Sequence, residues 1–215
     1  AADHLGFGLS DKPVDWSYQP EALARNLEDL IGHLGLRRLS LVVHDWGGPI
    51  GLAYAIRHPD NVSRLVLFNS WMWSAAGDLR TRLVARCLSS PLYLTLEERF
   101  AITARLFTRL AVADRRRVPE DTFRHFVEPF GRREDRQGLK ALVGSIRTAD
   151  GWVGSLWEER HRIAHLPALI CWGMRDPAFP VRYLMRWEEL FEEVEVCRLP
   201  TSGHYPHEET PAFVG

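Results

Sequence analysis

Four short apolar segments stand out along the chain, and polar, glycine or proline residues border them. They span residues 39–44, 65–69, 168–173 and 194–199. Apolar runs of this length with such borders predict β-strands, because a helix needs a longer pattern. In the first segment apolar side chains occupy most positions, which is typical of a parallel-sheet strand buried on both faces.

Two helices are predicted around the first of these strands. In residues 18–34, leucine and isoleucine recur at helical spacing, and Gly35 provides a stop signal. Residues 47–57 form the second helix, which ends before Pro59 because the residue preceding a proline disfavours helical geometry. Strands that alternate with helices predict a mostly parallel α/β sheet flanked by helices on both faces.

The long stretch from residue 74 to 165 breaks this alternation. It contains no convincing strand but several windows with a helical pattern, at residues 96–110, 119–127 and 139–147. Because the strand pattern resumes directly afterwards, we interpret the stretch as an all-helical cap and not as a separate domain. The predicted division is a core of residues 1–73 and 166–215 with a helical cap at 74–165.

Composition and charge narrow the function classes. Of the 215 residues 46% are hydrophobic, enough for a sizeable core, and the formal net charge is −1. The overall electrostatic field of the protein therefore does not favour binding to nucleic acid or to an anionic membrane. We interpret the arginine clusters at 115–117 and 132–133 as solvent-exposed. No bilayer-spanning apolar run, secretory signal or cysteine spacing for a metal is visible. We expect a cytoplasmic protein without nucleic-acid, membrane or metal partners.

The most informative stretch is LVVHDWGG at residues 41–48, a strand, a tight turn and the start of a helix. Small residues beside a reactive apex are typical of the nucleophile elbow of α/β-hydrolases, with Asp45 where a serine usually stands. The alternative is that Asp45 only caps the helix. An ionised carboxylate attacks saturated carbon without a base, and the resulting alkyl ester must then be hydrolysed.

Ester hydrolysis requires a general base, an acid that orients it and an oxyanion donor. His204 follows the last strand and is the predicted base, with His207 as the weaker alternative. Asp176 follows the strand at 168–173 and is the predicted acid, unless it only forms a turn before the next proline. The backbone N–H of Trp46 is the natural oxyanion donor.

Four segments carry a family resemblance: DHLGFGLSDKP at 3–13, the stretch from Val42 to Asn69, CWGMRDPAF at 171–179 and TSGHYPHEE at 201–209. Together they resemble haloalkane dehalogenases. The resemblance implies hydrolysis of a small halogenated aliphatic substrate by water to an alcohol and a halide ion, without a cofactor. It also implies that Asp45 is the nucleophile, that Asp176 orients His204, and that the indole N–H of Trp46 donates to the departing halide.

Two questions remain after this comparison: which residue is the second halide donor, and whether the protein is an epoxide hydrolase instead. Family members use either a cap tryptophan or an upstream asparagine as the second donor. The candidates here are Trp71 and Trp73 at the start of the cap, with Trp152 and Trp157 near its end. Epoxide hydrolases share the Asp, His and acid but activate the epoxide with typically two cap tyrosines. Between residues 71 and 165 only Tyr93 is present, and Val43 stands where their elbow usually has glycine. Both features favour the dehalogenase.

No strand is predicted before the loop at 3–13, whereas an α/β-hydrolase has about four strands there. We therefore expect a partial core whose N-terminal strands are missing, with the strand that bears Asp45 at an unpaired edge. A final helix is expected to begin at 210–215. The non-enzymatic alternative is a non-catalytic remnant that is unstable or pairs with another chain.

Overall fold

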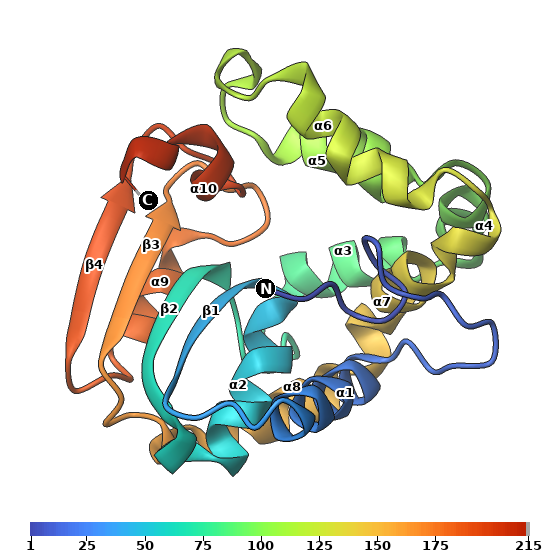
Figure 1. The fold of residues 1–215 in the computed structure, drawn as a ribbon. Helices are drawn as coiled ribbons and strands as arrows, with labels where there is room; N and C mark the ends of the chain where they lie inside the picture. Colours follow the sequence, from blue (N-terminus) through green and yellow to red (C-terminus); the bar gives the residue numbers. More distant parts are fainter. Residues whose placement is uncertain (214–215) are drawn as a thin grey trace.

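The computed structural model describes residues 1–213. Its centre is a four-stranded sheet in which every neighbouring pair of strands is parallel, in the order β1-β2-β3-β4 (Figure 1). The strands are β1 Leu39–Asp45, β2 Val62–Ser70, β3 Ala168–Gly173 and β4 Val194–Leu199. The predictions for β1, β3 and β4 are confirmed to within one residue, and β2 is longer than predicted.

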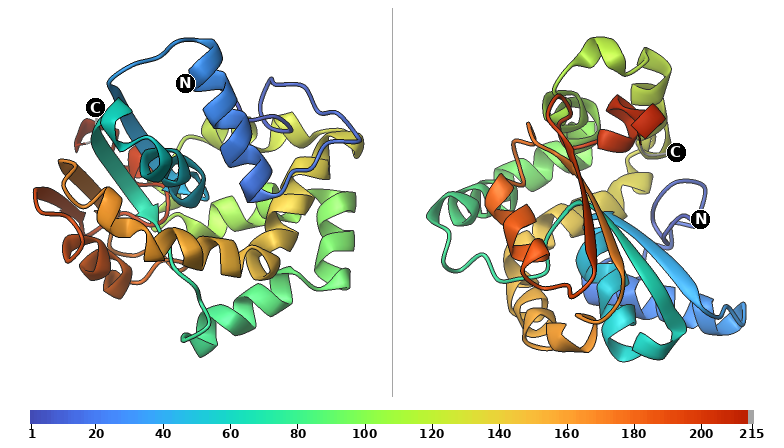
Figure 2. Two further views of the ribbon diagram at one scale, coloured as in Figure 1. Left: turned by 90° about the horizontal axis from the view of Figure 1, so that it is seen from below. Right: turned by 90° about the vertical axis from the view of Figure 1, so that its left-hand side faces the viewer.

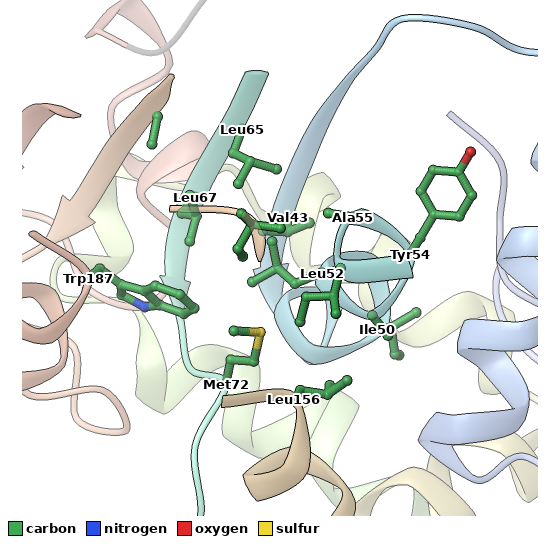
Figure 3. Close-up of a cluster of buried hydrophobic side chains, with 14 of the residues drawn as sticks. Val43, Ile50, Leu52, Tyr54, Ala55, Leu65, Leu67, Met72, Leu156 and Trp187 are labelled. Atoms are coloured by element: carbon green, nitrogen blue, oxygen red, sulfur yellow. The ribbon is translucent and has the colours of Figure 1, made fainter. Parts of the chain in front are cut away.

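One face of the sheet forms the hydrophobic core. Alternate strand residues such as Val43, Leu67 and Ile170 pack there against helices that follow or precede the strands (Figure 3). These helices are α1 Pro20–His33, α2 Gly47–Arg57, α8 Asp150–Glu158 and α9 Val181–Glu188. A parallel sheet flanked by helices is therefore confirmed.

The opposite face of the sheet is less covered. Residues of β1 alternate between more and less exposed positions, and Val42 keeps 65% of its surface exposed. The prediction that this strand is buried on both faces is therefore wrong. Figure 2 (right) shows α9 on one side of the sheet and the short helix α10, Pro206–Glu209, on the other. As expected, β1 is an edge strand, and within residues 1–213 only β2 pairs with it.

Residues between β2 and β3 are helical and contain no strand. Helices α5 and α6 stand beyond the carboxyl ends of the strands (Figure 1). The helices are α3 Leu79–Leu88, α4 Pro91–Phe100, a π-helix at Thr103–Phe107, α5 Thr108–Ala111, α6 Glu120–Val127, α7 Gln137–Thr148 and α8. Of these, α8 packs in the main core beside α2. The division into core and cap stays a prediction.

The predicted helix at 96–110 is wrong in one respect, because it is interrupted. Ala101 adopts a left-handed conformation with φ 49° and ends α4. The predicted start of a helix at 210–215 falls on a 3₁₀ turn, Pro211–Phe213, and on residues 214–215, which lie outside the described residues. Throughout the described part of the chain, no helix is both long and apolar enough to cross a membrane.

Candidate active site

Asp45 stands at the tip of a sharp turn between β1 and α2. Its φ of 48° lies in the left-handed region, which few residues other than glycine, asparagine and aspartate adopt. The Oγ of Ser70 donates a 2.7 Å hydrogen bond to the backbone carbonyl of Asp45 and holds this turn to β2. A Cβ on Gly48 would lie 1.8 Å from Ser70 Oγ, so only glycine fits this approach of α2 to the sheet.

Three groups act on the Asp45 carboxylate: the imidazole of His204, the backbone N–H of Trp46 and the negative charge of Asp176. Burial raises the pKa of this carboxyl; the charge of His204 and the backbone N–H of Trp46 oppose that shift without cancelling it. The helix α2, which begins at Gly47, directs the positive end of its dipole toward the same turn. Asp45 is thus a partly buried carboxylate at a helix N-terminus, next to an imidazole.

The predicted base and acid are brought together. The Nδ1–H of His204 donates to Oδ2 of Asp176 at 2.8 Å, and the side chain of Asp176 is fully buried. The other carboxylate oxygen of Asp176 accepts from the backbone N–H groups of Ala178 and Phe179, at 2.7 and 3.1 Å. With its Nδ1 proton committed to Asp176, the neutral imidazole of His204 carries its lone pair on Nε2, as a general base requires.

The pKa of His204 is raised above its ordinary value of 6.5. Burial acts to lower the pKa, but the hydrogen bond to Asp176 and the negative charges of Asp176, Asp45 and Glu209 outweigh it. The imidazolium form that arises when a base takes a proton is therefore stabilised. An arrangement of this kind suits proton abstraction from water.

Two buried residues that sequence reasoning did not assign to the site hold its loops. The side-chain amide of Asn69, at the end of β2, donates to the carbonyl of Gly173 at 3.0 Å and accepts from its N–H at 2.8 Å. Glu209 accepts from the N–H groups of Gly203 and Ala113 at 2.7 and 2.9 Å. Asn69 therefore fixes the turn that leads to Asp176, and Glu209 ties the base loop to the segment after α5.

Of the predicted halide donors, the structure brings Trp71 and not Trp73 beside Trp46. The rings of Trp46 and Trp71 meet edge to face with centroids 4.8 Å apart. Trp71 stacks on Phe179, which in turn stacks on His204. Trp73 instead packs among aromatic residues of the core, namely Trp157, Tyr183 and Trp187. An aromatic wall thus runs from Trp46 to the base.

Comparison with known proteins places the chain in a family. A family model described as alpha/beta hydrolase fold matches residues 1–211. The chain belongs to the α/β-hydrolase fold family. It is 32% identical to haloalkane dehalogenase 2 of Mycobacterium tuberculosis over 216 residues, which cover 98% of this chain and 73% of the relative. It is therefore a haloalkane dehalogenase-like hydrolase of this family.

The chain is also similar to a relative with a different activity and to solved structures. A cis-3-alkyl-4-alkyloxetan-2-one decarboxylase of Shewanella oneidensis is 31% identical over 94% of this chain and 66% of the relative. The crystal structure of haloalkane dehalogenase DbeA from Bradyrhizobium elkani superimposes with a TM-score of 0.85. That match covers 99% of this chain and 76% of the other at 21% identity, so it supports the fold alone.

Within residues 1–213 no cluster of three or more His, Cys, Asp or Glu side chains has an arrangement that could hold a metal ion.

Proposed function

We propose that this hydrolase releases halide from small or medium haloalkanes through an aspartyl ester on Asp45. The observation that carries the proposal is an aspartate at the apex of the elbow, electrostatically linked to the hydrogen-bonded pair of His204 and Asp176. A serine at the apex would need the base for its own activation, whereas a carboxylate attacks unaided and leaves the base for water.

In the first step, one oxygen of the ionised Asp45 attacks the carbon that bears the halogen. The carbon–halogen bond breaks, its electron pair leaves with the halide, and an alkyl ester forms on Asp45. Positive ends of N–H dipoles around the leaving group lower the barrier because negative charge grows there in the transition state. The indole N–H of Trp46 is the proposed main donor.

In the second step, water attacks the carbonyl carbon of the ester, and Nε2 of His204 takes the water proton. The backbone N–H of Trp46 stabilises the negative oxygen of the tetrahedral intermediate. Collapse of the intermediate releases the alcohol and restores the carboxylate of Asp45, and His204 returns its proton to solvent. The net reaction converts haloalkane and water to alcohol, halide and a proton.

The cap is part of the proposal. Helices α5 and α6 stand beyond the carboxyl ends of the strands (Figure 1). The end of α5 and the segment after it contact the base loop through Glu209 and through the 2.9 Å hydrogen bond from His204 N–H to the carbonyl of Ala111. A helical cover at this position excludes water from the first step and selects the substrate by shape. We assign the cap to residues 74–165, with α8 as its anchor on the core.

Trp71 is the proposed second halide donor. Replacing Trp71 with phenylalanine keeps an aromatic ring beside Trp46 but removes the N–H, so kcat/KM for a bromoalkane should fall by roughly 10- to 100-fold, the worth of one hydrogen bond to a charged group. Trp73→Phe is the matched control, because Trp73 packs away from Trp46. Steady-state bromide release measures both variants. Equal losses in the two variants would contradict the assignment.

Epoxide hydrolysis is the alternative that shares the same three residues. It needs a phenol that donates to the epoxide oxygen, and the hydroxyl of Tyr93 lies 3.1 Å from Thr103 Oγ1. Desolvation raises the pKa of Tyr93, which keeps it a neutral donor. One such tyrosine in the cap is a weaker arrangement than the indole pair at Trp46 and Trp71.

The deciding experiment offers the same protein three substrates: 1-bromobutane, styrene oxide and a cis-3,4-dialkyloxetan-2-one. We expect bromide and 1-butanol in equal amounts from the first. Diol from the epoxide without bromide would establish the epoxide hydrolase instead, and carbon dioxide from the oxetanone would establish the decarboxylase. A folded chain that converts none of the three would refute the proposed function.

A further inference from the structure

His44 lies at the end of β1, directly before the proposed nucleophile, and its side chain reaches the loop of the proposed base. Its Nε2 lies 2.7 Å from the backbone carbonyl oxygen of His204, and the two imidazole centroids are 4.6 Å apart. A carbonyl oxygen only accepts hydrogen bonds, so Nε2 of His44 carries the proton and donates it. One side chain thus joins the elbow to the base loop.

The surroundings of His44 keep its imidazole neutral. Burial, followed by the charges of His204 and His207, lowers the pKa of His44 well below 6.5, and the hydrogen bond to the carbonyl of His204 opposes this only in part. The rings of His207 and Tyr205 lie 5.0 and 5.4 Å away and bring no negative charge. A neutral ring with its proton on Nε2 leaves Nδ1 unprotonated.

We propose that His44 is a positioning residue for the base. Its hydrogen bond to the carbonyl of His204 sets the distance between the base loop and Asp45. The inference rests on the proposed function, in which His204 acts only on the second step.

Other contacts of the base loop do not supply this distance. Asp176 orients the ring of His204, while Glu209 and the carbonyl of Ala111 hold the loop to the C-terminal segment and to the cap. Among the hydrogen bonds of the described residues, the one from His44 links His204 directly to β1, the strand that bears Asp45. Its loss should therefore leave alkylation of Asp45 intact and slow the hydrolysis of the ester.

Two substitutions test this role with 1-bromobutane in rapid-mixing experiments. His44→Leu removes the donor at similar bulk, whereas His44→Gln keeps an N–H at the reach of Nε2. In the leucine variant we expect the initial burst of bromide to keep its wild-type rate and steady-state turnover to fall on the order of 10²-fold, as for a misplaced catalytic group. The glutamine variant should recover most of that loss.

A residue with only a packing role would slow both steps together, or would lower the melting temperature without changing their ratio. Either result, or full turnover in the leucine variant, would overturn the inference. A second readout needs no substrate: ¹⁵N NMR of the wild-type imidazoles should show His44 neutral and protonated at Nε2 at pH 7. Protonation at Nδ1 would also overturn the inference, whereas absence of bromide from the wild type would count against the proposed function alone.

Discussion

Replacing His204 with glutamine is expected to leave a protein that is alkylated once and then stops. The first step needs only the carboxylate of Asp45, so one equivalent of bromide should appear at close to the wild-type rate. The second step loses its base, and turnover should fall about 10²- to 10⁴-fold, the usual contribution of general base catalysis. The alkyl ester should accumulate on Asp45.

Intact-protein mass spectrometry after reaction with 1-bromobutane should show one added butyl group, and peptide mapping should place it on Asp45. His33→Gln is the matched control, since His33 is exposed at the end of α1 and should leave turnover unchanged. If the His204→Gln protein is folded but acquires no alkyl group, His204 is needed for the first step and the assigned sequence of steps is wrong.

The pH dependence supplies a further readout of the same variant. Hydrolysis needs His204 unprotonated, and the pKa of His204 is raised above 6.5, so wild-type kcat should decline as the pH is lowered through that raised value. The negative charge of Asp45 disappears when its ester forms, so the shift in the intermediate is smaller than in the free enzyme. Residual hydrolysis by the glutamine variant should not show this ionisation.

Which parts of the fold the sequence predicts depends on how local their causes are. The predicted bounds of β3 and β4 match the structure to the residue, because segments of six residues rich in apolar side chains are too short for most helices. The break at Ala101 has no such local signal. There the carboxylate of Glu97 accepts from the N–H and hydroxyl of Thr103, and this contact accompanies the end of α4.

The site divides in the same way. Asp176 and His204 could be predicted as partners because both follow neighbouring strands of a parallel sheet, whose carboxyl ends meet at one edge. The contacts of Asn69, Glu209 and His44 depend on how loops from distant parts of the sequence lie against one another. No spacing in the sequence carries that information, and their side chains occur equally well on a surface.

Removing the nucleophile should have the largest effect. In an Asp45→Asn protein, the rate of bromide release should fall by a factor on the order of 10⁴ or more, as it does when the nucleophile of a catalytic triad is removed. Both steps disappear, because no ester forms. Asparagine is also the mildest change at this position: it matches the shape of aspartate and tolerates the left-handed conformation that Asp45 adopts with φ 48°.

The Asp45→Asn substitution should raise the stability of the folded protein although it removes activity. The pKa of Asp45 is raised in the folded protein, so folding favours its protonated form, and stability is lost as pH rises from the ordinary value of 3.8 through the raised value. The neutral asparagine does not carry this loss. The variant should therefore melt at a higher temperature than the wild type near pH 7, and the difference should shrink as the pH approaches 3.8.

The two readouts together separate catalysis from folding. Asp60→Asn changes an exposed aspartate in the 3₁₀ turn Pro59–Asn61, at the opposite end of α2 from the elbow, and should change neither the bromide rate nor the melting temperature appreciably. An Asp45→Asn protein that melts well below the wild type would mean that the carboxylate stabilises the elbow, and its inactivity would then say little about chemistry. A stable variant that still releases bromide would remove Asp45 from the role of nucleophile, and with it the reason that this fold leaves His204 free for water.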